Sequence, residues 1–251
     1  ISGHAEIPVI TRDMGPIFAG TNVTNIDSKL ANRQAENTLL TAEQFATLAY
    51  LLGAPYPFEA MDHAWGQILF NSHHDAITGT EGDQVYLDLS FGWREAYELA
   101  RGVLERSLLT IGKVIDTERI EGTPLAVFNS LSWPRDDIVT FELAFPQNKV
   151  KGIKILDPEG RAVPYQADDY LRNKNGDIRW LKASFIGEQI PPMGYRVFQV
   201  VPLSDGGLVL PREQEITPST QQIILQNQFY EITIDPSRGG GIVSLLDKES
   251  G

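Results

Sequence analysis

The spacing of hydrophobic residues changes once along this chain of 251 residues, at about residue 120. Before that point apolar residues recur every three or four positions, which predicts α-helices. After it they come in short runs rich in β-branched and aromatic residues and separated by turns, which predicts strands. The segment 121–124 reads Glu-Gly-Thr-Pro and is typical of a linker. The chain is therefore predicted to be an α+β multidomain protein.

Three amphipathic helices are expected over about residues 27–52, 57–70 and 84–117. Their connections are short, which favours antiparallel neighbours and predicts a three-helix bundle. The apolar stripe of the first helix consists of Leu30, Ala35, Leu39, Ala42, Phe45, Ala46, Ala49 and Leu52. That of the third consists of Val85, Leu89, Trp93, Ala96, Ala100, Val103, Leu104, Leu108, Ile111 and Ile115.

The ends of these helices carry recognisable signals. Asp27 or Ser28 is expected to cap the first helix, and Asp83 the third, because short polar side chains accept hydrogen bonds from free amides at a helix N-terminus. Gly53 is expected to end the first helix, and Pro55 prevents its continuation.

Short strands are expected beyond the linker, over residues 125–129, 138–143, 150–156, 179–185, 195–201, 223–225 and 229–234. No helical spacing separates them, and turn sequences such as Asp157-Pro158-Glu159-Gly160 stand between them. Many short strands without intervening helices predict an antiparallel β-sandwich. Trp133 and Trp180 are expected in the core of this sandwich, and Trp65 and Trp93 in the core of the helices.

Charge and composition exclude several classes of partner. The net charge is −12 and the sequence pI is about 4.8, so neither nucleic acid nor an anionic membrane is an expected partner, since both need a basic surface. No apolar run reaches the ~18 residues of a membrane-spanning helix. There is no cysteine, which fits a reducing compartment, and we expect a cytoplasmic protein. Composition does not indicate an oligomeric state.

The most distinctive motif is the segment 71–80, Asn-Ser-His-His-Asp-Ala-Ile-Thr-Gly-Thr, in the loop between the second and third expected helices. It contains two of the four histidines, followed at once by a carboxylate. Imidazole and carboxylate side chains bind metal ions and transfer protons near neutral pH. Adjacent side chains in an extended loop point in opposite directions, so one of His73 and His74 is expected to face an ion.

Two interpretations of this motif stay open on the residues alone. A catalytic zinc ion needs three or four protein ligands, and neither His4 nor His63 has ligand-like spacing to the motif, so a metal site requires ligands from outside this chain. In the other interpretation the loop is structural: a histidine bonds backbone groups at a helix end, and Asp75 forms an Asx-turn.

The segment 73–80 resembles the signature loop of the retaining α-mannosidases of glycoside hydrolase family 38. Further segments are similar to the same family. Residues 20–24 and 29–37 are similar to the segment where its catalytic domain passes into a helical middle domain. Residues 128–134 are similar to the opening of its C-terminal β region. Residues 230–235 and 240–251 are similar to the start of its large β-sandwich.

The resemblance implies roles for individual residues. His74 would be a ligand of Zn²⁺, Asp75 would hydrogen-bond sugar hydroxyls, and His73 would line the −1 subsite. The other zinc ligands and the nucleophile would lie outside this chain, which contains no His-x-Asp. Asp13 is the candidate general acid/base. The implied partner is an α-mannoside or a mannose-containing oligosaccharide, hydrolysed with retention.

The resemblance also implies a division of the chain. Residues 1–26 would be the end of a catalytic domain, 27–120 the helical middle domain, and 121–251 a β-sandwich region. The chain is thus expected to be a fragment of a larger enzyme and inactive alone. The alternative is a non-catalytic carbohydrate-binding or structural β-sandwich module with a helical appendage.

Overall fold

The computed structural model of the chain describes residues 9, 11, 19–146, 149–205 and 221–250. Within these ranges it contains four α-helices followed by antiparallel strands, so the α+β class predicted from the sequence is confirmed. None of the helices in the described ranges combines the length and the apolar character needed to cross a bilayer.

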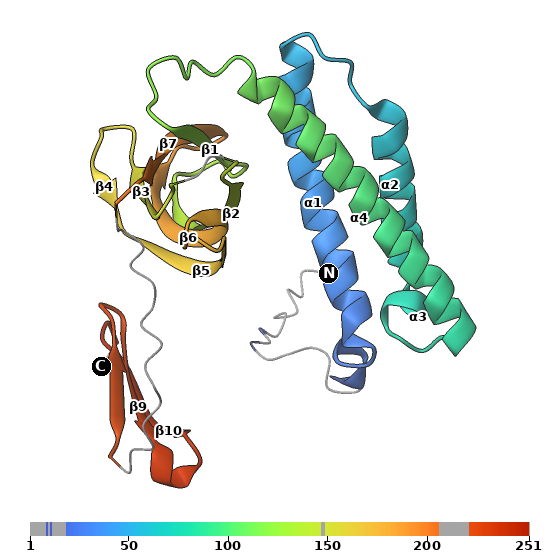
Figure 1. The fold of residues 1–251 in the computed structure, drawn as a ribbon. Helices are drawn as coiled ribbons and strands as arrows, with labels where there is room; N and C mark the ends of the chain where they lie inside the picture. Colours follow the sequence, from blue (N-terminus) through green and yellow to red (C-terminus); the bar gives the residue numbers. More distant parts are fainter. Residues whose placement is uncertain (1–8, 10, 12–18, 147–148, 206–220, 251) are drawn as a thin grey trace, which may run out of the picture. The chain divides into compact units, whose positions relative to one another are not determined.

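Three long helices lie side by side in the first part of the chain (Figure 1). They are α1 (Ile26–Leu51), α2 (Phe58–Asn71) and α4 (Asp83–Gly112), and each contacts the other two. A 3-10 helix, η1 (Ala19–Asn22), precedes them. The short helix α3 (His74–Ile77) follows α2 and was not predicted.

Small and branched apolar residues form the core of the three helices, because close approach of helix axes favours small side chains at the contacts. The buried residues of this cluster are Ala35, Leu39, Ala42, Ala46, Met61, Ala64, Ile68, Ala96, Ala100 and Val103. Trp65 packs against the cluster, and Trp93 is fully buried beside Leu89 and Ala76. Leu30 and Leu52, placed in the core from the sequence, are exposed near the two ends of α1.

The helix ends differ in part from those expected. The residue that precedes α1 is Asn25, in a left-handed conformation with φ 46°, and its side chain makes no capping hydrogen bond. Asp27 lies in the first turn, where its carboxylate accepts a hydrogen bond from the Tyr86 hydroxyl of α4. This bond lowers the pKa of Asp27 and raises that of Tyr86.

The C-terminal end of α1 is as expected, and that of α4 is not. Gly53 has φ 98°, a left-handed conformation that costs glycine nothing, and its amide donates to Tyr50 O. The last helix α4 ends at Gly112, five residues short of the predicted 117, although Ile115 is still buried. The helix begins at Asp83 after Gly82, so Asp83 is a first-turn acid and not the cap.

The strands after the linker form three sheets. The first has the order β1-β7-β3-β4, the second β2-β6-β5 and the third β10-β9-β8. Their bounds are β1 (Thr123–Asn129), β2 (Arg135–Ala144), β3 (Gly152–Leu156), β4 (Ala162–Val163), β5 (Tyr165–Arg172), β6 (Ile178–Ile190), β7 (Gly194–Leu203), β8 (Ile223–Gln226), β9 (Tyr230–Asp235) and β10 (Gly241–Asp247). The pairs β5–β6, β8–β9 and β9–β10 are antiparallel.

Seven of these strands coincide with predicted runs, and three do not. The strands β4 and β5 were missed because the segment is polar, and β5 contains Asp168 and Asp169 next to each other. Trp133 is exposed and lies outside the core, contrary to the prediction, because it falls in the turn between β1 and β2.

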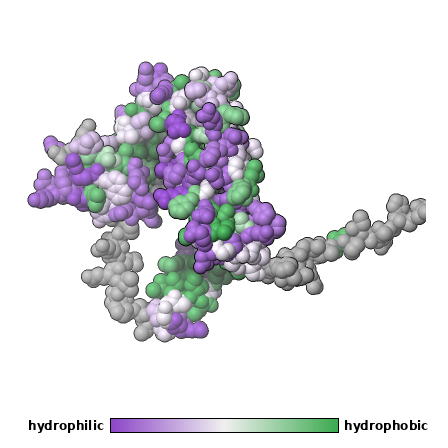
Figure 2. Space-filling view, turned by 90° about the vertical axis from the view of Figure 1, so that its right-hand side faces the viewer, coloured by the Kyte–Doolittle hydropathy of each residue, from purple (hydrophilic) through white to green (hydrophobic). Residues whose placement is uncertain are grey.

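The sheet of β8, β9 and β10 exposes most of its hydrophobic side chains, and Figure 2 shows them gathered as a green area. All four residues of β8 and six of the seven of β10 are exposed. In the part of the chain that the structure describes, β8 and β10 lie at the edges of this sheet.

The chain groups into two compact units. One comprises Ile1–Asp136 and Gly187–Gln199, and the other Asp137–Ile186 and Val200–Gly251. In the first unit, Phe45 of α1 meets Phe128 of β1 edge to face, with ring centroids 5.6 Å apart. The division of the sequence at residue 120 stays a prediction.

Candidate active-site loop

The His-His-Asp motif lies between α2 and α4, where the chain forms one turn of helix. His73 is the N-cap of α3, and its carbonyl accepts hydrogen bonds from the amides of Ala76 and Ile77 at 2.9 and 3.0 Å. Its side chain also takes part, since Nδ1 accepts from the amide of Asp75 at 3.3 Å. A histidine thus bonds the backbone at a helix end, as the structural interpretation of the loop expected.

Neighbouring side chains hold both ends of this turn. Asn71 is fully buried at the end of α2, and its Nδ2 donates to Leu89 O of α4 at 2.8 Å. After α3, the Thr78 hydroxyl donates to His74 O at 2.5 Å and the Thr80 hydroxyl to Asp75 O at 3.1 Å. These bonds satisfy carbonyls that a helix of one turn leaves free.

Gly79 makes the tight exit from α3 possible. Its φ is 73°, and a Cβ at this position would lie 3.1 Å from both the carbonyl oxygen and Cγ2 of Thr24. Any other residue would be strained by its backbone conformation and crowded by the chain before α1. The Thr-Gly-Thr part of the motif therefore has a structural reason of its own.

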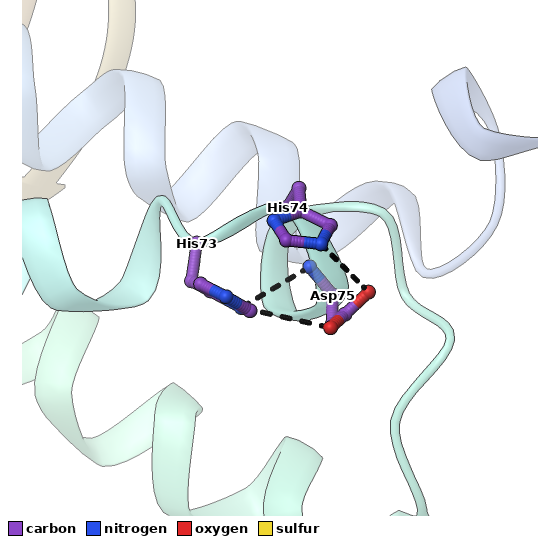
Figure 3. Close-up of side chains that lie close together, drawn as sticks. All are labelled: His73, His74 and Asp75. Atoms are coloured by element: carbon purple, nitrogen blue, oxygen red, sulfur yellow. Dashed lines mark hydrogen bonds and ion pairs between the residues drawn. The ribbon is translucent and has the colours of Figure 1, made fainter.

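The three polar side chains come together on the exposed side of the loop (Figure 3). His74 Nε2 lies 3.4 Å from Asp75 Oδ1, and His73 Nδ1 lies 4.0 Å from Asp75 Oδ2. The two imidazole rings are 4.3 Å apart between centroids. The expectation that adjacent histidines point in opposite directions is wrong here, because the turn at His73 replaces the extended loop.

One atom from each of the three side chains can be chosen so that all lie within 4.8 Å of one another, the spacing of groups that can share a metal ion. The side chains are 58% (His73), 81% (His74) and 71% (Asp75) exposed. Nδ1 of His73 already accepts a hydrogen bond from the Asp75 amide. The side chain of His74 lies beside the Asp75 carboxylate and is the most solvent-exposed of the three. Among the described residues this is the group that could hold a metal ion.

A cavity of about 570 Å³ opens beside the motif, and its wall is predominantly apolar. It is lined by the end of α2, by α3 and by the start of α4, with the residues Leu69, Phe70, Ser72, His73, Asp75, Ala76, Glu81, Val85 and Leu89. His73 and Asp75 thus face a space large enough for an organic group or a peptide side chain.

The other residues considered from the sequence are not part of this group. Asp13 and His4 lie outside the described residues. His63 is on α2, where its Nε2 lies 3.2 Å from Glu95 Oε1 of α4. The sequence analysis assigned no role to Asn71, the first residue of the motif, and did not single out Glu81. The role of Asn71 follows from its hydrogen bond to α4, and Glu81 is marked only by the burial of its carboxylate oxygens.

Part of the chain matches a known protein family, and one curated relative is similar to it. Residues 17–111 match the family model described as "Alpha mannosidase middle domain". The human epididymis-specific α-mannosidase is 30% identical over 146 residues, which cover 52% of this chain and 12% of that protein.

Two solved structures share the fold. The crystal structure of an α-mannosidase from Enterococcus faecalis V583 matches 93% of this chain and 29% of its own length, with a TM-score of 0.67 and 21% identity. That of a protein in glycosyl hydrolase family 38 from Enterococcus faecalis matches 93% of this chain and 30% of its own length, with a TM-score of 0.70 and 21% identity. The chain therefore spans less than a third of each relative. Residues 17–111 are therefore similar to an α-mannosidase middle domain, and the chain shares the fold of the two solved structures.

Proposed function

We propose that this chain is the middle and early β part of a zinc-dependent retaining α-mannosidase, which hydrolyses terminal α-D-mannosides. The observation that carries the proposal is the exposed group of His73, His74 and Asp75, which lies within the segment matched to the α-mannosidase middle domain. The α+β architecture supports it, and we propose that α1, α2 and α4 act as an antiparallel bundle and the strands as the first part of a β-sandwich.

His74 is the residue proposed to hold the metal ion. The described residues supply an exposed imidazole with a carboxylate beside it, which fits part of a zinc site and leaves the remaining ligands to residues outside this chain. Of the two histidines, His74 has the more open ring, and its Nε2 makes no hydrogen bond to the backbone among the described residues. When bound, zinc would supply a Lewis acid able to grip two vicinal sugar hydroxyls.

Asp75 and His73 are proposed to bind the sugar. The Asp75 carboxylate is exposed and, as an ionised group, accepts hydrogen bonds, so it can orient hydroxyls of a mannose residue. His73 is fixed by its cap to the Asp75 amide, which leaves its ring edge as a wall of the −1 subsite. In this proposal the two residues position substrate and do not transfer protons.

The chemistry of bond cleavage is proposed to use residues beyond the loop. A retaining glycosidase needs a nucleophilic carboxylate and an acid/base carboxylate about 5 Å apart. The nucleophile would lie outside this chain, and Asp13 is the proposed acid/base. The chain alone is therefore expected to be inactive.

The proposal is tested on the complete protein with an aryl α-mannoside. Activity should be lost with a chelator and restored by Zn²⁺, and proton NMR of the first product should show the α-anomer of mannose, as retention requires. His74→Ala should lose both bound zinc and activity, whereas His73→Ala should keep stoichiometric zinc and lower kcat/KM less. Full activity of the His74→Ala protein, or an initial β-anomer, would contradict the assignment.

A further inference from the structure

A network of polar side chains crosses the sheet of β2, β6 and β5, and the proposed function does not use it. Ser184 Oγ of β6 donates to Asp168 Oδ2 of β5 at 2.5 Å, and Gln166 Nε2 donates to Asp168 Oδ1 at 2.9 Å. The hydroxyl of Thr140 in β2 lies 2.8 Å from Ser184 Oγ. Since the one proton of Ser184 goes to Asp168, the Thr140 hydroxyl donates to Ser184. The three strands thus surround a single carboxylate with hydrogen bonds.

A β-bulge brings Asp168 into this network. The pairing of β5 with β6 shifts between Ala167 and Asp169, so Asp168 is the extra residue on β5. Ala167 is buried, whereas Asp168 and Gln166 lie on the exposed face of the strand. The hydrogen bonds from Gln166 and Ser184 hold the carboxylate in one orientation, so a ligand that binds there does not have to order it.

A cavity of about 440 Å³ opens at this network. Its wall includes Gln166, Asp168 and Ser184 together with the apolar side chains of Ile138 and Ile186, which are 67% and 50% exposed. All the residues that line it belong to one of the two compact units, the one that contains Asp137–Ile186. The volume is in the range of sites for small organic molecules.

The hydrogen bonds determine which ligand chemistry fits the cavity. A carboxylate has about four acceptor positions, and two of those of Asp168 are occupied. Among the described residues, no donor takes the others or Oε1 of Gln166, so this face presents acceptors. A ligand must therefore bring several donors and also a carbon surface for Ile138 and Ile186.

A pyranose ring meets both demands, because it has hydroxyls around its edge and C–H groups on its face. A metal ion fits less well, since within the described part of the chain the carboxylate of Asp168 is the single one that lines the cavity. Divalent cations that prefer oxygen ligands are bound by several of them at once.

We propose that the face of β2, β6 and β5 at Asp168 is a sugar-binding site, which takes one mannose unit of a mannose-containing glycan. The carboxylate accepts hydrogen bonds from two neighbouring hydroxyls, and the C–H face of the ring packs on Ile138 and Ile186. The sugar class follows from the network and the cavity, whereas the choice of mannose among pyranoses rests on the proposed function.

Native affinity electrophoresis in gels that contain α-mannan measures this binding without relying on catalysis. The migration of the complete protein at increasing mannan concentration gives the Kd. Asp168→Asn should raise the Kd about 10-fold, because charge-assisted hydrogen bonds are roughly twice as strong as neutral ones. Asp169→Asn is the matched control, since it makes the same change at the next residue, which does not line the cavity, and it should leave the Kd unchanged.

The apolar wall gives a second, independent test. Ile138→Ser should raise the Kd by about 3-fold or more, because the C–H face of the sugar loses apolar surface to pack on. Leu171→Ser is its control, since Leu171 of β5 is also exposed, by 62%, and does not line the cavity. Circular dichroism and thermal unfolding verify the fold of each variant. Ile138 is exposed, so its variant keeps the test decisive even if Asp168→Asn disturbs the bulge.

Three results would overturn the sugar site: wild type that is not retarded by mannan, a Kd that neither Asp168→Asn nor Ile138→Ser changes, or equal increases in the variants and their controls. The two proposals also fail separately. If the complete protein does not cleave the aryl α-mannoside but its migration in mannan depends on Asp168, the sugar site stands and the proposed function falls. If it is an active zinc enzyme with the same Kd for mannan in wild type and in both variants, the proposed function stands and the sugar site falls.

Discussion

Asn71 reaches from the end of α2 into α4, where its Nδ2 donates to Leu89 O at 2.8 Å and its side chain lies against Gly92. A Cβ on Gly92 would lie only 2.8 Å from Asn71 Nδ2 and from Gln67 Oε1. Gly92 of α4 and Asn71 of α2 therefore fit each other. Asn71 lies two residues before His73, the first histidine of the motif. The position of the loop depends on this contact.

Gly92→Ala should destabilise the chain by about 1–3 kcal/mol, because the new methyl group displaces two polar side chains in a packed contact. The gain in helix propensity, roughly 0.5–1 kcal/mol, is too small to compensate. Gly66→Ala is the matched control, since a Cβ at Gly66 of α2 meets nothing within 4 Å and should stabilise the helix. Urea unfolding of both variants measures the difference, and equal effects would contradict the proposed fit.

Asn71→Ala should cost about 1–3 kcal/mol in the free energy of unfolding. The change removes a buried hydrogen bond and leaves a small void under the loop, so a lower affinity for zinc in the complete protein should accompany it. Isothermal titration with Zn²⁺, together with urea unfolding, separates the two effects. Unchanged affinity would show that the loop keeps its position without Asn71.

His73→Ala should loosen α3, because the Asp75 amide loses its acceptor at Nδ1. The cost is expected to be about 0.5 kcal/mol, at the lower end for an N-cap, since the bond is exposed and 3.3 Å long. Hydrogen exchange at the Asp75 amide should become faster in His73→Ala and recover in His73→Asn, whose side chain can cap the same turn. Exchange that does not recover would mean that the imidazole stabilises α3 by other contacts.

Because of Asp177, the stability of the β region should decrease as the pH becomes acidic. Its carboxylate, 6% exposed, pairs with Lys151 at 2.7 Å and accepts a hydrogen bond from Asn173, and these contacts lower its pKa below the usual value of 3.8. A pKa lowered on folding stabilises the protein above the pKa of the unfolded state, and this contribution is lost as the pH falls through the folded pKa.

Asp177→Asn should therefore lower the thermal midpoint at pH ~7, and the difference from wild type should shrink as the pH falls below ~4. Glu142→Gln is the control, because Glu142 meets Lys182 at 3.7 Å and both side chains are exposed. The measurement is the thermal unfolding midpoint of wild type and of both variants at several pH values between acid and neutral. A constant difference would assign the effect of Asp177 to packing and not to its charge.

Limited proteolysis should cut first between Thr117 and Thr123, in the connection that follows α4. The segment contains Gly122, with φ 81°, and lies between the end of α4 and the start of β1. Most of its residues are exposed, which makes its backbone accessible to a protease. First cuts inside α1 or α4, identified by mass spectrometry, would argue against a domain boundary at this place.

The long helices could be predicted from the sequence because their apolar stripes repeat over many turns. The prediction failed at Leu30 and Leu52, near the ends of α1, and at Val85, near the start of α4. The apolar stripe continues at these positions, but the side chains are exposed. The end of α4 was misplaced for a related reason, since Ile115 keeps the apolar spacing after the helix has ended.

The motif could be found from the sequence, but its geometry could not. A helix of four residues is shorter than any hydrophobic period, and the turn at His73 comes from hydrogen bonds between near neighbours. Glu81 had no local signal at all, because the burial of its carboxylate oxygens is a property of the folded chain. The role of a residue that depends on the folded arrangement of the helices can be recognised only from the structure.

The exposed sheet of β8, β9 and β10 bears on how the chain behaves at high concentration. Among the described residues, its edge strands β8 and β10 have no further strand beside them, and they carry exposed apolar side chains such as Ile224 and Leu245. This combination favours association between molecules. Light scattering of the purified chain should rise with concentration. A shortened chain that ends at residue 205, without this sheet, should remain monodisperse and be the better starting material for crystallisation.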